Sequence, residues 1–446
     1  MTKSILCGLV LSGFAFVFSS LADIQYAGVN LSVAEFGQNN LPGSYGHDYM
    51  WPTNGETAYY QSRGMNFIRL PFRWERLQLT NSSALFTGTN SINSAPMANF
   101  VNYATSHGMY VLLDPHNFMR YYPNPRSNFQ GATNGLIGTP SPIYSASYAD
   151  FSNFWYQVAA IYKTNDHVFF GLNNEPNSIQ ETQLVAALNS GIQGIRNAGA
   201  TNMIFVPGNN YTAAYTWTSS NGIYGAANSV AMLGIVDPAS NYCFEVHQYL
   251  DANNSGANDG IVSTDIGWQR LTNFTAWARS NNFKAFLGEF GAPGNTFGSG
   301  TNGGTALTNM LSYVVTNSDV WLGWTYWGGG PWWGAGATFP VEPANPGNPT
   351  DTTTMSVIKE FTPLPVPILQ IVNNNTQFQY SAPQGFVYQV QYSTDLTSSA
   401  NWANLGSAIT NVQPPGPLGP STNAPFTVNL GSDPQGFYRV VVSHAP

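Results

Sequence analysis

The chain has 446 residues, of which 8 % are charged and 14 % are aromatic, and its formal net charge is −8. Soluble domains average about 25 % charged residues, so this surface must be polar through asparagine, serine, threonine and glycine instead. An acidic chain with no cluster of lysine and arginine argues against nucleic acid and anionic membrane surfaces as partners.

The N-terminus has the pattern of an export signal. Lys3 precedes an apolar run over residues 5–18, and Ala22 ends a cleavage sequence with small residues. We therefore expect a signal peptide over residues 1–22 and a protein that is secreted, to the periplasm or the extracellular space. No later run reaches the about 18 apolar residues that a membrane span requires, so we expect no membrane partner.

The cysteines and histidines argue against disulfide bonds and metal sites. Cys7 leaves with the signal peptide, and Cys243 remains alone, so no intramolecular disulfide is expected. Cys243 is then interpreted as a small buried hydrophobic side chain. The six histidines show no paired ligand spacing, so the sequence predicts no metal and no cofactor.

Apolar runs of strand length recur at regular intervals through most of the chain. Helical patterns lie between several of them, around residues 151–162, 184–195 and 307–314. Eight such units in about 320 residues predict a (β/α)₈ (TIM) barrel, assigned to residues 23–360. The alternative, an open doubly wound sheet, lacks a Gly-x-Gly-x-x-Gly sequence after its first strand. The expected strands are residues 26–31, 66–72, 110–115, 168–173, 203–207, 242–250, 285–290 and 320–327.

The pattern changes after the barrel. Residues 361–367 contain three prolines, which predict a short stiff linker. Apolar and polar residues alternate in several places over residues 368–446, as they do in half-buried strands. We therefore expect a small C-terminal antiparallel β-sandwich as an accessory domain. Its one tryptophan, Trp402, is expected in the core.

Two of the apolar runs reach a glutamate and then break. Residues 168–174 precede Glu175 and Pro176, and residues 284–288 precede Glu289. A carboxylate at the C-terminal end of a buried strand is costly to bury, which favours a functional role. The two glutamates therefore form a candidate acid/base pair.

Other polar and aromatic residues follow the remaining strands, where the strand ends and βα loops of a barrel form its functional face. Each has a structural alternative, because Asn-Glu-Pro can cap a helix, arginine can hold an ion pair, and histidine or tryptophan can fill a core. Their convergence on one rim with two acids favours a site. Asp114 is expected to orient its neighbours, and Glu342 to be a loop carboxylate. The candidates are Arg69, His116, Asn174, Trp217, His247, Tyr249, Trp327, Trp332 and Trp333.

These motifs, in this order, resemble glycoside hydrolase family 5, and most closely its fungal-type endo-β-1,4-glucanase (cellulase) branch, over residues 25–345. The resemblance implies that Glu175 is the general acid/base and Glu289 the nucleophile. Pro176 and the missing disulfides depart from the fungal pattern and suggest a bacterial relative. The resemblance gives supporting roles to Arg69, His116, Asn174, His247, Tyr249 and Trp327. The segments that carry it are residues 28–31, 41–49, 68–76, 114–117, 173–175, 247–251, 288–290 and 327–334.

The chemistry of such a site sets clear requirements. Retaining glycosidases need two carboxyl groups about 5–5.5 Å apart, one as nucleophile and one as proton donor. Glu289 must stay ionised, which Arg69 and the Tyr249 hydroxyl can favour, and Glu175 must begin protonated. Asn174 can hydrogen-bond the sugar 2-hydroxyl. The flat faces of the tryptophans and of Tyr249 can stack on pyranose rings.

The sequence thus predicts a secreted, retaining endo-β-1,4-glucanase that cuts internal bonds of cellulose through a covalent glycosyl-enzyme. Two alternatives stay open. The same machinery can act on mannan, xyloglucan or mixed-linkage β-glucan, because a fold does not decide its substrate. A carbohydrate-binding protein without turnover is the more remote alternative. The expected partner is a β-1,4-linked glucan polysaccharide, and the expected oligomeric state is a monomer.

Overall fold

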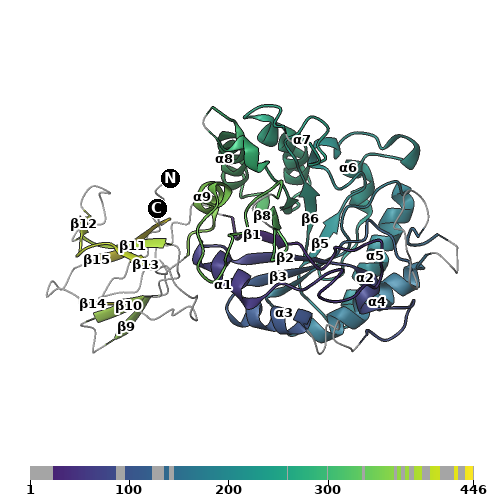
Figure 1. The fold of residues 1–446 in the computed structure, drawn as a ribbon, viewed down its shortest axis with the longest axis horizontal. Coiled ribbons are helices and arrows are strands. Elements are labelled where there is room, and N and C mark those ends of the chain that lie inside the picture. Colours follow the sequence, from purple (N-terminus) through teal and green to yellow (C-terminus); the bar gives the residue numbers. More distant parts are fainter. Residues whose placement is uncertain are drawn as a thin grey trace.

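The computed structural model describes most of the chain as a barrel with a smaller strand region beside it (Figure 1). The predicted export signal, residues 1–22, lies outside the described residues. These are residues 24–86, 96–122, 135–139, 145–258, 260–298, 300–333, 337–365, 369–372, 377–380, 386–393, 402–411, 426–429 and 437–444.

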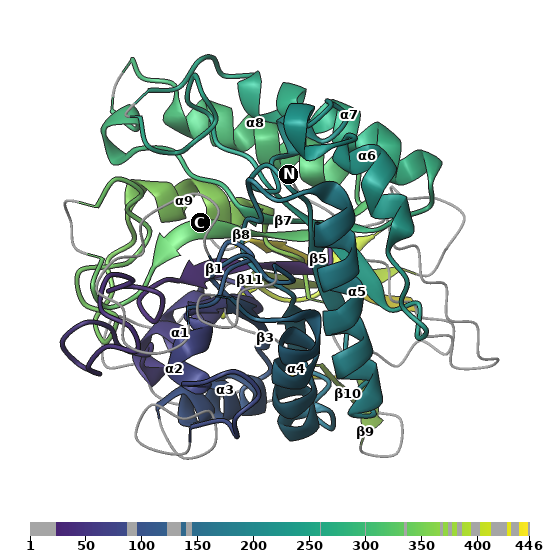
Figure 2. The ribbon, with the colours of Figure 1, turned by 90° about the vertical axis from the view of Figure 1, so that its right-hand side faces the viewer.

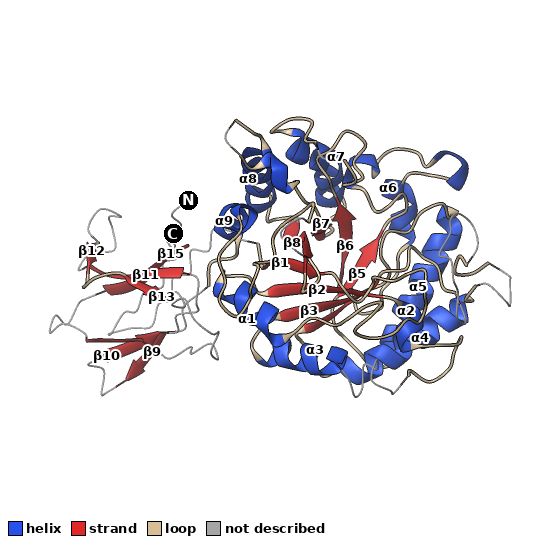
Figure 3. Ribbon diagram, in the orientation of Figure 1, coloured by secondary structure: helices blue, strands red, loops and turns tan. Residues whose placement is uncertain are grey.

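Eight parallel strands close into a barrel, in which each strand pairs with the next and β8 returns to β1. The strands form the centre and helices surround them (Figure 3). The predicted (β/α)₈ barrel is confirmed, and β1 and β3 have the limits expected from the sequence. The strands are β1 Tyr26–Leu31, β2 Phe67–Phe72, β3 Tyr110–Pro115, β4 Val168–Gly171, β5 Ile204–Pro207, β6 Tyr242–His247, β7 Ala285–Glu289 and β8 Trp321–Gly329.

The outer helices follow the predicted apolar stripes. In α4 (Tyr148–Tyr162), every residue of the stripe from Phe151 to Tyr162 is buried, and a capping box with Ser147 satisfies the helix N-terminus. Helix α5 (Glu181–Asn197) lies beside it (Figure 2), and Gly194 allows the α4 backbone to come close. The other helices are α1 Asn54–Ser62, α2 Trp74–Leu77, α3 Pro96–Ser106, α7 Ile266–Ser280, α8 Gly303–Thr316 and α9 Thr353–Ile358.

The connection from β5 to β6 departs from the expected βα repeat. It contains no helix longer than the four residues of α6 (Asn228–Ala231), and the whole connection is described. Its sequence is rich in Gly, Asn, Ser and Thr and has no helical stripe, which explains the irregular path. The remaining turns are the 3₁₀ helices η1 Ala214–Thr216, η2 Gly222–Tyr224 and η3 Met232–Gly234; η4 Gly294–Thr296 and η5 Lys359–Phe361 lie elsewhere.

The barrel interior is built in layers. Near the N-terminal ends of the strands, inward-pointing apolar side chains fill the space, and the rings of Phe67 and Phe286 lie 4.9 Å apart. Side chains alternate with a period of two along a strand, so the residue two further on points into the next layer. That layer is charged in this protein, with Arg69 above Phe67 and Glu245 above Cys243. The lower layer consists of Phe67, Leu112, Phe169, Phe205, Cys243, Phe286 and Leu322.

The C-terminal strands form two small antiparallel sheets beside the barrel (Figure 1), and the predicted antiparallel domain is confirmed. Strand β11 is central in one sheet, and its Phe386 packs against Gly64 at the end of α1. The strands are β9 Leu369–Val372, β10 Gln377–Tyr380, β11 Phe386–Ser393, β12 Ala403–Asn404, β13 Ile409–Asn411, β14 Phe426–Asn429 and β15 Phe437–His444.

Among the helices of the described residues, none combines the length and the apolar character that crossing a membrane requires.

Candidate active site

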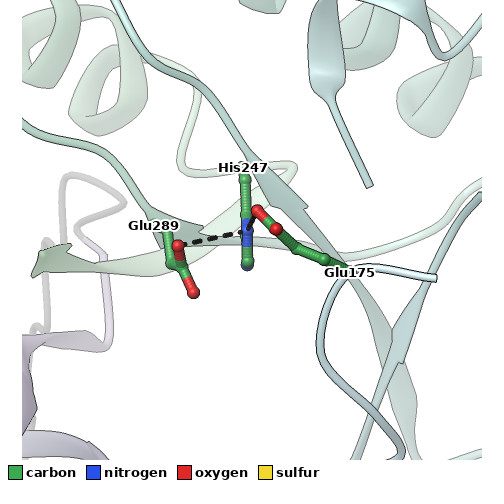
Figure 4. A group of neighbouring side chains, drawn as sticks. All are labelled: Glu175, His247 and Glu289. Carbon is green, nitrogen blue, oxygen red and sulfur yellow. Dashed lines mark hydrogen bonds and ion pairs between the residues drawn. The ribbon is translucent and has the colours of Figure 1, made fainter. Parts of the chain in front are cut away.

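The two candidate acids meet at the C-terminal end of the barrel. Glu175 follows β4, Glu289 ends β7, and the imidazole of His247 lies between them (Figure 4). One carboxylate oxygen of each glutamate and one ring nitrogen of His247 all lie within 4.8 Å of one another. The structure therefore brings the predicted pair together, at a separation close to the about 5–5.5 Å typical of retaining glycosidases.

Arg69 is the electrostatic centre of the charged layer. Its side chain is fully buried, and acceptors surround the whole guanidinium. Burial acts against the charge, but three carboxylates outweigh it and raise the pKa of Arg69. Its acceptors, with distances from the nearest guanidinium nitrogen, are Glu245 Oε1 at 2.7 Å, Asn174 Oδ1 at 2.8 Å, Asn30 Oδ1 and Glu289 Oε1 at 2.9 Å, and Asp114 Oδ2 at 3.1 Å.

Both oxygens of Glu289 are bound. Oε1 accepts from Arg69, and Oε2 accepts a hydrogen bond of 3.1 Å from the Tyr249 hydroxyl. These are the two contacts expected from the sequence. Burial nevertheless raises the pKa of Glu289 to about 7, because the positive charges of His247 and Arg69 offset the loss of water only in part. Arg69 and His247 are therefore the groups that favour the ionised form of Glu289.

Glu175 has a different environment from its partner. Its side chain is 18 % exposed against 5 % for Glu289. Its backbone φ is +41°, a left-handed conformation that costs a non-glycine residue roughly 1–2 kcal/mol. The amide of Tyr211 donates to the Pro176 carbonyl at 3.0 Å and helps to hold this turn. Such strain at the end of β4 is typical of functional sites.

His247 connects the two acids. Its Nδ1 lies 2.7 Å from Glu175 Oε1 and 3.5 Å from Glu289 Oε2, and its Nε2 lies 3.5 Å from Glu245 Oε1. Burial alone would lower the pKa of His247, but the Glu289 charge and the hydrogen bonds to Glu175 and Glu245 raise it to about 10. His247 is thus an imidazolium, and both of its nitrogens donate.

His116 is the neutral counterpart on the other side of the site. Burial, with the nearby Arg73 and Arg69, keeps its pKa well below the usual value. The neutral ring donates from Nδ1 to Asp114 Oδ2 at 3.0 Å, so Nε2 accepts from the Asn174 amide at 3.0 Å. Asn174 is thereby fixed, because its oxygen is bound by Arg69 and its nitrogen by His116.

Three of the four candidate tryptophans lie around this rim. The ring of Trp327 stacks beside His116 with centroids 5.6 Å apart. Trp333 meets Trp327 edge-on at 6.1 Å and donates from Nε1 to the Ser32 carbonyl at 2.7 Å. Trp332 is 39 % exposed. All three belong to β8 and the segment that follows it.

The expectation that Trp217 contacts a sugar is wrong. Its side chain is fully buried, and it packs edge-on against Phe244 and Phe274 at 5.7 and 5.0 Å. Trp277 of α7 covers it at 5.3 Å. The chain after β5 turns this ring into the space between β6 and α7, so no face is open to a ligand.

Several residues of the site were not found from the sequence. Glu245 and Asn30 hold Arg69, and both lie inside strands, where an apolar run hides them. The period of two from His247 back to Glu245 was the available signal. A pocket of about 580 Å³ also opens beside Glu175 and His247, with Tyr211 and Tyr215 among its lining residues.

The donor set of Glu175, His247 and Glu289 also has the spacing for a metal ion, and no other such set occurs among the described residues. The positive charges of Arg69 and His247 already neutralise these carboxylates. Arg69 lies 2.9 Å from Glu289, and an imidazolium has no free lone pair to offer. The arrangement therefore suits proton exchange between carboxylates.

Comparison with known proteins agrees with this geometry. Residues 27–330 match the family described as cellulase (glycosyl hydrolase family 5). The probable endo-beta-1,4-glucanase B of Aspergillus oryzae is 36 % identical over 324 residues, which cover 72 % of this chain and 86 % of that protein.

Solved structures share the fold of the barrel. XacCel5A in complex with cellopentaose has a TM-score of 0.67 and 35 % identity, and covers 76 % of this chain and 99 % of its own. The endo-beta-1,4-glucanase Xac0029 of Xanthomonas axonopodis pv. citri has a TM-score of 0.66 and 37 % identity, over 75 % of this chain and 98 % of its own.

Proposed function

The chain belongs to glycosyl hydrolase family 5, the cellulase family, and from that premise we propose that it is a secreted, retaining endo-β-1,4-glucanase. It is a glycoside hydrolase of the cellulase type. The observation that carries the retaining mechanism is the separation of Glu175 and Glu289, whose nearest oxygens lie within 4.8 Å. An inverting enzyme needs about 6.5–9.5 Å between its carboxyl groups, to admit a water molecule.

In the first step, Glu289 is the nucleophile. Its carboxylate attacks the anomeric carbon and forms a glycosyl ester, while Glu175 gives its proton to the departing glycosidic oxygen. Tyr249 and Arg69 hold the two Glu289 oxygens, so the side chain is aimed before the substrate binds. Ester formation removes the charge of Glu289.

In the second step, Glu175 is the base. It is now a carboxylate and takes a proton from a water molecule that attacks the same anomeric carbon and releases Glu289. The hydrogen bond from His247 Nδ1 favours this ionised form of Glu175. Two displacements at one carbon return the sugar to its original configuration.

The surroundings of the pair suit a glucan chain. The second Asn174 amide hydrogen, which has no acceptor among the described residues, can donate to the 2-hydroxyl of the sugar at the cleavage point. Trp327 and Trp333 offer apolar faces on the rim on one side, and the pocket with Tyr211 and Tyr215 lies on the side of Glu175, where the leaving group would bind.

We assign cellulose as the substrate because the relatives are named endo-β-1,4-glucanases and a structural neighbour was solved with cellopentaose. Mannan, xyloglucan and mixed-linkage β-glucan remain the alternatives for the same machinery.

We further propose export through residues 1–22, a catalytic domain over residues 23–360, a linker over residues 361–367 and an accessory domain over residues 368–446.

Proton NMR of cellopentaose hydrolysis tests the proposal. We expect the β-anomer of the new reducing end to appear first and the α-anomer to follow by mutarotation. A first product with α configuration would overturn the retaining mechanism, and no cleavage at all would overturn the glucanase. A panel of β-glucans and mannan ranks the substrates, and the highest kcat/KM on mannan would replace cellulose as the assigned polymer.

A further inference from the structure

A third glutamate, which is buried, lies directly beneath the two acids. Glu245 is on β6, two residues before His247 and on the same side of the strand, and it is 2 % exposed. Room for its carboxylate comes from Gly288 on β7, because a Cβ at that position would overlap the Glu245 side chain. The fold therefore reserves space for a charged group that the two displacement steps do not use.

Glu245 anchors both cations of the site. Arg69 donates from Nε to Glu245 Oε1 at 2.7 Å and from Nη1 to Glu289 Oε1 at 2.9 Å. His247 has the same two-ended arrangement, with Nε2 at 3.5 Å from Glu245 Oε1 and Nδ1 at 2.7 Å from Glu175 Oε1. Each cation thus has one end on Glu245 and the other on a catalytic carboxylate. Figure 4 shows the imidazole between the two acids.

The charge of Glu245 is fixed by its neighbours. Burial alone would raise the pKa of Glu245, but Arg69 and His247 outweigh this and lower it. The negative charge in turn helps to raise the pKa of His247. The titratable and charged groups around Glu245 and His247 are Arg69 on β2, Asp114 and His116 from β3, Glu175 after β4, Cys243 and Tyr249 from β6 and its end, and Glu289 on β7.

We propose that Glu245 is a positioning residue of this active site, which holds the far ends of Arg69 and His247 so that both cations face the catalytic carboxylates. The inference rests on the proposed function, because the two carboxylates are the groups it serves. Without the anchor, the imidazole can turn about its Cβ–Cγ bond, and the Nδ1 donor to Glu175 is lost. The guanidinium likewise loses the contact that fixes its tilt.

Glu245→Gln tests the charge at nearly constant volume. We expect kcat to fall about 10- to 100-fold on cellopentaose while KM changes less than about 3-fold. The alkaline limb of the kcat/KM profile should move to lower pH by about one unit, because the missing anion no longer helps His247 to hold its proton. If Glu245 only filled space, the variant would have a lower kcat/KM at every pH, and the alkaline limb would stay at the same pH.

Glu56→Gln is the matched control. Glu56 is also a buried carboxylate at 2 % exposure, but it lies on α1 and bonds to Thr53. Its variant should leave the position of the alkaline limb unchanged. Glu245→Asp keeps the negative charge but places it farther from Arg69 and His247. We therefore expect a lower kcat, with the alkaline limb of the profile near its wild-type position. If Glu245→Gln does not fold, the aspartate variant decides, and a wild-type kcat in it would overturn the inference.

A second readout does not depend on turnover. Imidazole ¹⁵N NMR of the protein without substrate should show a lower pKa for His247 in Glu245→Gln than in the wild type. An unmoved His247 titration together with an unmoved alkaline limb would overturn the role of Glu245. A wild type that leaves cellopentaose intact would instead overturn the proposed function, so the two failures are distinguishable.

Discussion

The two inner layers of the barrel are equally buried and opposite in chemistry. In the lower layer, aromatic rings pack against one another, and the centroids of Phe67 and Phe286 lie 4.9 Å apart. This layer requires only that the side chains fit together in shape. The upper layer, two residues further along the same strands, surrounds Arg69 with carboxylates and amides, and every charge needs a partner. Removing one partner from buried ions leaves the others uncompensated. Burial alone therefore does not identify a site, whereas a buried charge network does.

The two layers also differ in the substitutions that they tolerate. A packed apolar layer accepts substitutions that conserve volume. In the charged layer, a change of one atom from oxygen to nitrogen alters the protonation of its neighbours, because they share protons across short distances. Substitutions in the charged layer should therefore have effects that depend on pH, and substitutions in the apolar layer should not.

The largest effect on activity should come from Glu289→Gln. The amide keeps the shape but cannot form a glycosyl ester, so we expect kcat/KM on carboxymethyl cellulose to fall on the order of 10⁴-fold. The free energy of unfolding at pH 7 should change little, because the loss of the ion pairs with Arg69 and His247 is offset by the removal of a carboxylate whose burial is costly. Release of reducing ends measures the first quantity and urea unfolding the second. The exposed Glu360→Gln is the control, and a loss below 10-fold would exclude Glu289 as the nucleophile.

Arg69→Met should break the charged layer itself. We expect a loss of about 3–5 kcal/mol in the free energy of unfolding at pH 7, because three carboxylates lose their common cation. Those carboxylates then have raised pKa values in the folded state, so protonation should restore part of the stability as the pH falls toward 5. Urea unfolding at both values measures this.

The control for that variant is Arg279→Met, which removes an exposed pair with Asp319. It should cost less than about 1 kcal/mol at either pH. Equal losses in the two variants would mean that burial of the network has no special cost.

Phe67→Ala should lower stability and leave activity nearly unchanged, which is the opposite of the effect expected for Glu289→Gln. We expect about 3–5 kcal/mol of destabilisation, since the ring fills the lower layer against Phe286 and Phe169. The loss should not depend on pH between 5 and 8, and kcat of the folded enzyme should change less than about 3-fold. Phe67→Leu, which keeps more volume, should cost less than about half as much. A pH-dependent loss would show that the two layers are coupled.

The smallest effect should come from a half-buried carboxylate that has no cationic partner among the described residues. Glu342 accepts hydrogen bonds from the Tyr60 hydroxyl at 2.6 Å and the Gly330 amide at 2.9 Å, and burial raises its pKa to about 7. The folded state binds this proton more tightly than the unfolded chain, whose ordinary value is 4.5. The contribution to stability is therefore full below pH 4.5 and is lost as the pH rises through 7.

Glu342→Gln should match the wild type at pH 4.5 and exceed it by about 1–3 kcal/mol at pH 8, as urea unfolding can measure. Glu360→Gln should show no such crossover. Equal stability of Glu342→Gln and wild type at both values would contradict the raised pKa.

Much of this site could be predicted because its residues end apolar runs. Glu175 and Glu289 each follow a strand that is buried on both faces, so the break in the run marks the C-terminal end of the barrel. Glu245 gave no such break, since it stands within β6 and its carboxylate is compensated from other strands. Trp217 was misplaced because an aromatic residue gives the same signal in a core and on a binding surface.

The sequence alone predicted the barrel, the order of its strands and the two candidate acids that the barrel brings together, because burial on both faces and its interruption are local patterns. Only the tertiary structure decided that Arg69, His247 and Glu245 form one network and that Trp217 faces the core. These depend on the stagger of strands that lie far apart in sequence. Contacts across a closed barrel leave no trace in the spacing of residues along the chain.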